Sequence, residues 1–362
     1  MKKLLSHSKT KHELTIYLAN KAIERSSRQR ERRFVVSFGN ECKATHKDVS
    51  HLASNHEEAD TKIILHAVDA TMNGATEIHI HLPDTDVLVL ALRRYPQMCS
   101  KVSFVTGKGA NHRSIKLEPI VQALGEAKIA ALPAFHAFSG ADNTGCFSGY
   151  GKPLLWKAFV GLKEEVIKEM AKLGTTPTPQ DETIAAFEKF LCKVYVPSTS
   201  LETVKELRWL LFRRKQAELE RLPPTQPVIR EAVLRAHYQA MVWNNDVVAN
   251  PQIPSPENYG WEQKDQSWLP VMTRLPPAPD AVIELVRCGC KTKCASNRCQ
   301  CRRARLPCTD LCVCYDDDEP CQNVSEDVRE EDDDDNENMF QEVRYLKPTN
   351  IKIAQLNFEI SY

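Results

Sequence analysis

The chain has 362 residues, and its 48 basic and 48 acidic side chains leave no formal net charge at pH 7. This length allows two or three domains. The start of the chain turns polar at Ser6, too early for the apolar core of a signal peptide. Because no segment approaches the roughly 18 uninterrupted apolar residues of a membrane helix, we expect an intracellular protein.

Predicted helices and strands alternate along residues 1–174. They are, in chain order, a helix over Lys11–Arg25, a strand over Phe34–Phe38, a helix over Glu57–Ala70, strands over Glu77–Leu82 and Val102–Val105 with the apolar run Val87–Leu92 between them, and helices over Pro119–Leu124 and Ala127–Phe138. This alternation predicts an α/β domain with a parallel sheet. Its length is sufficient to bury a core.

The sequence pattern changes after Thr175, where the alternation of predicted strands and helices ends. We expect a helical region over 175–249, a Pro-rich linker over 250–283, a cysteine-rich module over 284–323 and an acidic, largely disordered tail over 324–362. The predicted helices of this part are Asp181–Val194, Leu201–Arg221 and Val228–Trp243. Trp261 and Trp268 are expected docking points on an extended linker with seven prolines between Asn250 and Asp280.

Nine of the 13 cysteines crowd into the 34 residues from Cys288 to Cys321, with the spacing C-x-C-x3-C-x4-C-x-C-x6-C-x3-C-x-C-x6-C. They are Cys288, Cys290, Cys294, Cys299, Cys301, Cys308, Cys312, Cys314 and Cys321. Such thiols serve either as disulfide partners or as metal ligands, and an intracellular chain favours metal. Three tetrahedral zinc ions need twelve zinc–sulfur bonds, which nine thiolates supply when three of them bridge.

Charge is distributed unevenly around these cysteines. Residues Arg287–Tyr315 carry seven basic side chains against Asp310 alone, whereas Asp316–Glu337 carries thirteen acids against Arg329. The net charges of the two segments are therefore +6 and −12. A basic module next to an acidic segment predicts a surface that binds a polyanion and a tail that competes with it. The alternative for the tail is a solvated, disordered linker.

Five carboxylates stand where an α/β sheet presents its functional edge, beyond the carboxyl ends of strands. They are Glu58, Asp60, Asp84, Asp86 and Asp142. Oxygen ligands suit Mg²⁺ or Mn²⁺, and a pair of such ions can orient a water and stabilise the leaving oxygen in phosphodiester cleavage. Each acid also has a local interpretation: the helix dipole favours Glu58 and Asp60 in a first turn, Asp84 caps a helix, and Asp142 holds a turn.

The order Glu58-Ala59-Asp60, Asp84-Thr85-Asp86 and Gly140-Ala141-Asp142, followed by Gly149-Tyr150-Gly151-Lys152, resembles the flap endonuclease superfamily of PIN-like nucleases. The resemblance covers about Asn55–Phe159 and implies that the five carboxylates are catalytic metal ligands. It also implies that Gly149, Gly151 and Lys152 form a hairpin that contacts a DNA phosphate. A Gly-rich turn before a helix over Leu154–Phe159 is the local alternative.

The family begins with a strand that carries a further metal-binding aspartate, but Asp48 is the only aspartate before Asp60 here. We therefore expect a PIN-like domain that lacks the usual first strand. Along the whole chain, the sequence is similar to mobile-element-derived animal proteins that join this domain to a cysteine-rich tail.

The cysteine segment resembles the tesmin-type CXC domain, in Cys288-Gly289-Cys290-Lys291, Arg298-Cys299-Gln300-Cys301 and Cys321-Gln322-Asn323. That family implies a cluster of three zinc ions on nine cysteines and, in several members, DNA binding. The basic residues Arg298, Arg302, Arg303 and Arg305 favour phosphate and groove contacts over a purely structural or protein-docking role. The acidic spacer Tyr315–Pro320, and Arg298 where many members have a tyrosine, depart from the family pattern.

Two functions fit these features. The first is a nuclear, Mg²⁺- or Mn²⁺-dependent endonuclease that a zinc module anchors to DNA. The second is an inactive nuclease scaffold that binds DNA, chromatin or protein through zinc. Histidines of the first domain, His136 among them, are interpreted as packing or surface residues.

Overall fold

The computed structural model describes residues 8–28, 33–213, 222–265, 267–273, 288–290, 293–303, 308, 312–314 and 321–323. They belong to two compact units, one within Met1–Leu207 and Pro223–Thr273 and the other within Arg208–Leu222 and Arg274–Gln355. Among the described residues, no helix is long and apolar enough to span a membrane.

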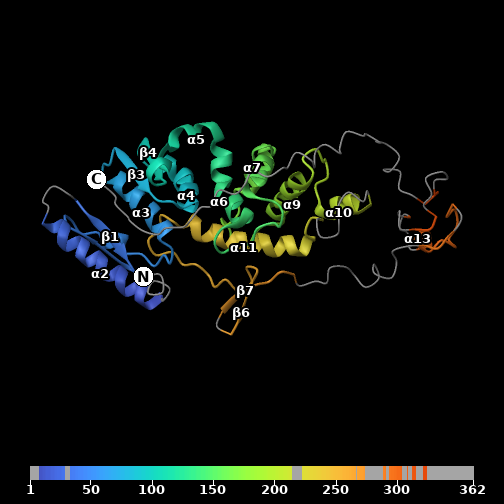
Figure 1. The fold of residues 1–362 in the computed structure, drawn as a ribbon. Helices are drawn as coiled ribbons and strands as arrows, with labels where there is room; N and C mark the ends of the chain where they lie inside the picture. The colour runs from blue at the N-terminus through green and yellow to red at the C-terminus, as the bar shows by residue number, and fades with distance from the viewer. Residues whose placement is uncertain are drawn as a thin grey trace. The chain divides into compact units, whose positions relative to one another are not determined.

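The first unit begins with a helix beside a β-hairpin (Figure 1). α2 (Ser8–Ser27) packs on β1 (Val35–Phe38), which pairs antiparallel with β2 (Glu41–Ala44). Gly39 lies in the short turn between the strands with a φ of +51°, a conformation that glycine adopts without a steric penalty. The predicted helix and first strand are confirmed, whereas the sequence pattern does not predict β2.

A three-stranded sheet lies at the centre of the α/β part. β3 (Glu77–His81) pairs parallel with β4 (Lys101–Thr106), and β5 (Arg113–Lys116) pairs antiparallel with β4. The α/β class is therefore confirmed, but the sheet is mixed, and the prediction of a parallel sheet is wrong for β5. The loop between β4 and β5 is too short for the crossover that a parallel neighbour requires.

Helices α3 (Ala59–Met72) and α4 (Thr85–Arg94) pack against each other, and α5 (Leu117–Leu124) packs on β4. Ile63, Ile64, Ala67 and Val68 form a buried apolar face of α3. The apolar run before Arg93 is the helix α4, whose Leu90 is fully buried. Short 3-10 turns occupy Ser50–Leu52, Tyr95–Gln97 and Gly109–Asn111.

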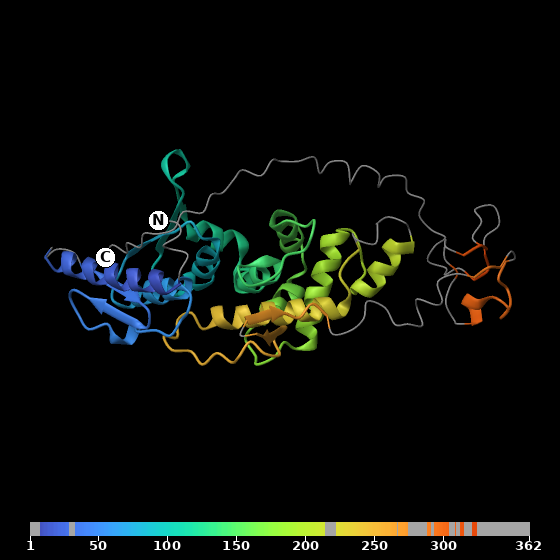
Figure 2. The ribbon, with the colours of Figure 1, turned by 60° about the horizontal axis from the view of Figure 1, so that its bottom comes forward.

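The remaining helices of this part of the chain are α6 (Glu126–Gly140), α7 (Lys152–Val160), α8 (Glu164–Met170), α9 (Asp181–Tyr195), α10 (Val204–Arg213) and α11 (Gln226–Asn244). The sequence pattern predicts all of them except α8, and residues 214–221 of the predicted helix Leu201–Arg221 lie outside the described residues. Figure 2 shows α11, in yellow, running alongside the green helices.

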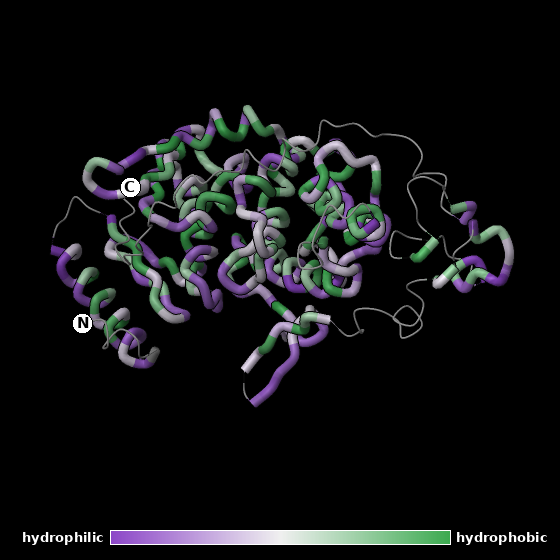
Figure 3. The backbone as a smooth tube through the Cα atoms, turned by 45° about the vertical axis from the view of Figure 1, so that its right-hand side comes forward, coloured by the Kyte–Doolittle hydropathy of each residue, from purple (hydrophilic) through white to green (hydrophobic). Residues whose placement is uncertain are grey.

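The core of the helical part is built around α6, which packs against α4, α8 and α11. Every residue of α6 from Ala131 to Ser139 is buried. The Phe138 ring lies 4.6 Å from that of Phe187 and 5.1 Å from that of Phe147, measured between ring centroids. In Figure 3, hydrophobic and hydrophilic stretches alternate along the helices of this unit. The same packing fixes the end of α6, from which the Asp142 turn begins.

A β-hairpin occupies part of the expected linker. β6 (Trp261–Lys264) pairs antiparallel with β7 (Ser267–Pro270), so this part of the chain is not simply extended. Arg235 of α11 anchors its base by donating from Nη1 to the carbonyl of Val271 at 2.6 Å. Trp268 remains 37% exposed on the hairpin.

Candidate functional site

The carboxylates expected to act together stand at helix ends. Glu58 is the N-cap of α3, and Asp60 lies in its first turn. Asp84 is the N-cap of α4, where its Oδ1 accepts a hydrogen bond from the backbone N–H of Asp86 at 3.0 Å. The capping role of Asp84 is therefore confirmed, and it orients the carboxylate at the start of α4.

Asp142 follows the end of α6 in a turn that another residue holds. Thr144 donates from Oγ1 to the carbonyl of Ala137 at 2.6 Å and accepts from the N–H of Ala141 at 2.8 Å. Gly140 has a φ of +108°, and a Cβ there would lie 3.0 Å from Cys146 Cβ. The prediction that Asp142 itself holds the turn is wrong, because Thr144 makes these hydrogen bonds. The Asp142 side chain is exposed.

The five carboxylates interact electrostatically. Desolvation, together with the charges of Asp84, Glu58, Asp86 and Asp142, raises the pKa of Asp60 to about 7. Desolvation also raises the pKa of Glu58, assisted by Asp86 and Asp142 and opposed by a hydrogen bond from Asn143 Nδ2 at 3.1 Å. The folded chain therefore brings these acids into one electrostatic cluster, named here the carboxylate cluster (Glu58, Asp60, Asp84, Asp86 and Asp142).

The carboxylate cluster is more open than a preformed cation site. Within the described part of the chain, only cysteines form groups of three or more potential ligand atoms that lie within 4.8 Å of one another. The oxygens of the carboxylate cluster do not form such a group. The carboxylate oxygens are of the chemical type that Mg²⁺ and Mn²⁺ prefer. Closer approach of these side chains is required before several of them contact one ion.

His136, interpreted from the sequence as a packing or surface residue, is a buried residue of this site. It is 4% exposed, and its Nε2 lies 2.7 Å from Oδ1 of Asp86. Its Nδ1 lies 3.3 Å from Nζ of Lys152. One signal could have indicated it: His136 precedes Gly140 by one helical turn at the end of the helix that leads to Asp142.

The segment Gly149–Lys152 forms the start of α7. Gly149 has a φ of +79°, and Gly151 is the helix N-cap whose carbonyl accepts from the N–H of Leu154 at 3.0 Å. The predicted Gly-rich turn before a helix is thus confirmed. Lys152 is the first residue of α7. Desolvation lowers the pKa of its ammonium, and the charges of Asp86, Asp142 and Asp84 oppose this shift only in part. The turn therefore places a cation beside the carboxylate cluster.

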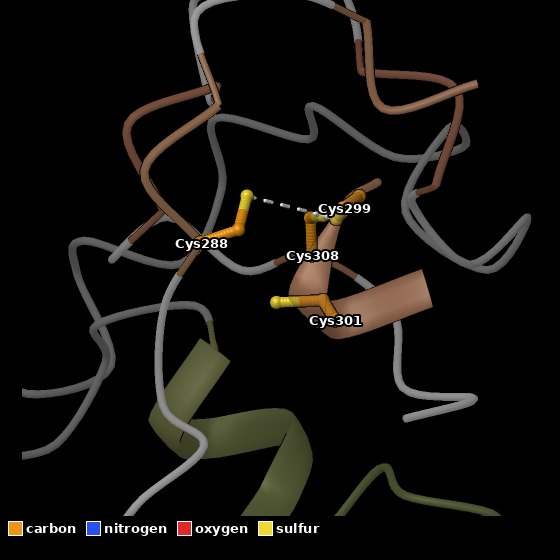
Figure 4. Close-up of side chains that lie close together, drawn as sticks. All are labelled: Cys288, Cys299, Cys301 and Cys308. Atoms are coloured by element: carbon orange, nitrogen blue, oxygen red, sulfur yellow. Dashed lines mark hydrogen bonds between the residues drawn. The ribbon is translucent and has the colours of Figure 1, made fainter. Parts of the chain in front are cut away.

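The nine clustered cysteines converge in the second unit, and eight of them are buried. The Sγ atom of Cys288 lies 3.4 Å from that of Cys314, 3.7 Å from that of Cys294 and 4.0 Å from that of Cys308. Figure 4 shows Cys288, Cys299, Cys301 and Cys308 directed toward a common centre. All nine are free thiols in this structure, so the disulfide alternative is not the arrangement observed.

The sulfur atoms form four overlapping groups of four, each suited to one metal ion. The groups are Cys288/Cys299/Cys301/Cys308, Cys288/Cys308/Cys312/Cys314, Cys288/Cys290/Cys294/Cys299 and Cys294/Cys308/Cys314/Cys321. Together they include all nine cysteines, and Cys288 and Cys308 each belong to three groups. Four thiolates per ion is the donor set of structural zinc sites. The cluster could therefore hold zinc ions that share sulfur ligands.

Backbone and side-chain donors orient the sulfurs. The N–H of Arg302, in the short helix α13 (Gln300–Arg303), lies 3.5 Å from Sγ of Cys299. Burial opposes ionisation of Cys299, but this N–H and the neighbouring thiols outweigh it and lower the pKa to about 6. Burial and a hydrogen bond to Cys312 raise the pKa of Cys301 to about 12. The cluster without metal therefore retains protons that a bound metal would release.

The arginines of the cysteine module take different places. Arg298, Arg302 and Arg303 are exposed, which leaves them accessible to a partner. Arg302 also donates from Nη1 to the carbonyl of Cys294 at 3.3 Å, so it supports the module as well. Arg305, the linker residues 274–287 and the acidic tail lie outside the described residues.

No protein-family model, curated protein or solved structure matches this chain.

Proposed function

We propose that the protein is a DNA-binding, metal-dependent phosphodiesterase of the PIN-like, flap endonuclease type, joined to a zinc-cluster module of the CXC type. The observation that carries the proposal is the carboxylate cluster, in which acids lie at the starts of α3 and α4 and after the end of α6. Burial and the charges of the neighbouring acids together raise the pKa of Asp60 to about 7. Strongly perturbed carboxyl groups of this kind are concentrated at functional sites.

A divalent cation suits the carboxylate cluster on electrostatic grounds. Without a cation, burial and the crowded charges favour a proton on Asp60 near neutral pH. Glu58, Asp60, Asp84, Asp86 and Asp142 would hold Mg²⁺ or Mn²⁺, with oxygen donors throughout. Such ions supply an oriented water and charge stabilisation at the leaving oxygen of a phosphodiester.

The start of α7 provides phosphate-binding groups beside the acids. The backbone N–H groups of a helix N-terminus and the ammonium of Lys152 both favour a phosphate. Gly149 and Gly151 are exposed and carry no side chain that would keep a nucleic-acid backbone away. In this proposal they bind the DNA strand whose phosphodiester reaches the carboxylate cluster.

The cysteine module would supply DNA affinity. About three zinc ions would hold its fold, because few apolar residues separate the cysteines. Arg298, Arg302, Arg303 and Arg305 would contact phosphates, and the acidic tail would compete for them. In this proposal the DNA is chromosomal, and the site of action would be the nucleus.

A nuclease assay on flap and single-stranded DNA with Mg²⁺ or Mn²⁺ tests the proposal. The wild-type protein should cleave, and the isosteric double variant Asp84→Asn/Asp86→Asn should lose cleavage. A Glu164→Gln/Glu165→Gln double variant is the matched control, because these acids occupy the first turn of α8. Equal cleavage by wild type and Asp84→Asn/Asp86→Asn, or none by wild type, would contradict the nuclease proposal.

A second candidate function is a zinc-dependent DNA- or chromatin-binding protein with an inactive nuclease scaffold. The observation that favours it is the contrast in ligand spacing: the cysteines lie within 4.8 Å of one another in groups of four, and the acids do not. Zinc-dependent DNA binding without cleavage in the same assay would support this function over the first.

A further inference from the structure

A chain of two contacts links three charged or polar side chains at the carboxylate cluster. Asp86 Oδ1 lies 2.7 Å from His136 Nε2, and His136 Nδ1 lies 3.3 Å from Lys152 Nζ. Asp86 and His136 are 9% and 4% exposed. The chain joins the first turn of α4, the last turns of α6 and the first residue of α7.

The chemistry of the two neighbours assigns the imidazole tautomer. A lysine ammonium can only donate hydrogen bonds, so His136 Nδ1 must accept. A carboxylate accepts, so His136 Nε2 carries the proton and donates it to Asp86. One tautomer of a neutral imidazole satisfies both contacts at once. This hydrogen bond uses one lone pair of Asp86 Oδ1 and leaves the other carboxylate lone pairs, including both of Oδ2, for a cation.

Packing keeps the imidazole in this position. Trp243 of α11 is 1% exposed, and its ring centroid lies 5.7 Å from that of His136 with an angle of 32° between the ring planes. Residues Phe135 and Ala137 on either side of His136 are also buried. A side chain held on its face by an aromatic ring and at both nitrogens by charged partners has little freedom to rotate.

We propose that His136 is a positioning residue for a divalent cation and a phosphate: Nε2 orients the Asp86 carboxylate toward the cation, and Nδ1 holds the Lys152 ammonium where a phosphate binds. This inference rests on the proposed function, because it assigns roles toward the same two ligands. The inference adds His136 to the five carboxylates of the site. One nitrogen of His136 orients Asp86, and the other holds Lys152.

The two tasks separate in two conservative variants. Glutamine places an amide nitrogen near the position of Nε2, so His136→Gln retains a donor to Asp86 but loses the acceptor for Lys152. Asparagine places an amide oxygen near the position of Nδ1, so His136→Asn retains the acceptor and loses the donor. His66→Gln is the control, because His66 is a buried histidine of α3 that contacts Ser37 instead of a carboxylate.

Titration of Mn²⁺ into the full chain, loaded beforehand with zinc, measures the first task. The expected loss of Mn²⁺ affinity in His136→Asn is about 10–100-fold, the usual effect of removing a hydrogen-bond partner of a ligand. His136→Gln and His66→Gln should bind Mn²⁺ like wild type. The KM for DNA at saturating Mn²⁺ measures the second task and should rise in His136→Gln more than in His136→Asn. Thermal unfolding confirms that each variant folds.

Equal Mn²⁺ affinity of wild type and folded His136→Asn would overturn the inference. An equal loss of Mn²⁺ affinity in His136→Gln and His136→Asn would also overturn it. If wild type binds Mn²⁺ but cleaves no DNA, the nuclease proposal fails while the orienting role toward Asp86 is still decided by the binding data. Absence of Mn²⁺ binding by wild type overturns both.

Discussion

Arg94 donates from Nε to the Oδ1 atom of Asp246 at 2.7 Å, and Asp246 is fully buried. Arg94 also donates from Nη2 to the carbonyl of Asn244 at 2.8 Å. The pair ties the C-terminal end of α4 to the turn after α11. Since α4 carries Asp84 and Asp86 at its other end, and α11 supplies Trp243 against His136, this ion pair holds together the two helices behind the carboxylate cluster.

Replacement of Asp246 by alanine should destabilise the first unit strongly. The substitution leaves the largely buried Arg94 guanidinium without its carboxylate, which costs about 3–5 kcal/mol in the free energy of unfolding. Urea unfolding measures the change. Glu164→Ala is the control, because its ion pair with Lys168 is exposed and such pairs contribute about 0–1 kcal/mol. Equal effects of the two substitutions would contradict this assignment.

Stability without divalent cations should depend on pH through Asp60. Its pKa is about 7 in the folded protein and about 3.9 in an unfolded chain, so the folded state binds a proton that the unfolded state has released. The free energy of unfolding should therefore fall as pH rises from about 4 to about 7 and then level off. Unfolding experiments across this range should show a shallower fall for Asp60→Asn. An identical slope in that variant would exclude Asp60 as the source.

Divalent cation affinity should show the opposite trend. A cation at the carboxylate cluster displaces the proton from Asp60, so Mn²⁺ affinity should increase as pH rises toward about 7 and become constant above it. Calorimetric titrations in buffers of different ionisation enthalpy measure the released proton. Affinity that does not vary over this range would mean that the ion displaces no proton from Asp60.

The cysteine module should contain about three zinc ions per chain, as nine thiolates and tetrahedral sites require. Elemental analysis of the purified protein checks the number. Removal of zinc by a chelator should unfold the module and leave the α/β and helical unit folded, because metal supplies most of the folding energy of such modules, about 10–16 kcal/mol per site in simple peptides. One zinc ion or none would reject the cluster.

Asn323 should strengthen zinc retention. Its side-chain Nδ2 lies 3.3 Å from Sγ of Cys308, and its backbone N–H lies 3.4 Å from Sγ of Cys321. Asn323→Ala removes the first donor and should weaken zinc binding by about 10–100-fold, as measured by competition with a chromophoric chelator. Gln322→Ala is the neighbouring control, because Gln322 contributes a backbone hydrogen bond to Lys293 that the substitution preserves.

Helices and strands with a strong hydrophobic period were predictable from the sequence. The burial of Ile78 and Ile80 between exposed neighbours illustrates why β3 could be identified. The short strands β2 and β5 were not predicted because their side chains are mostly exposed and only strand pairing identifies them. The grouping of the nine cysteines could be predicted from their spacing. His136 could not, since its contacts with Asp86 and Lys152 depend on how α4, α6 and α7 pack.

The sharing of Cys288 and Cys308 among several groups of sulfurs has a consequence for assembly. If zinc binds as proposed, the first ion brings together thiolates that the next ion also requires, so loading should be cooperative. Partly filled states would then be scarce, and native mass spectra at limiting zinc should show empty and complete modules side by side. Such a module would respond to metal supply in an all-or-none way, and damage to a shared sulfur would affect several ions at once.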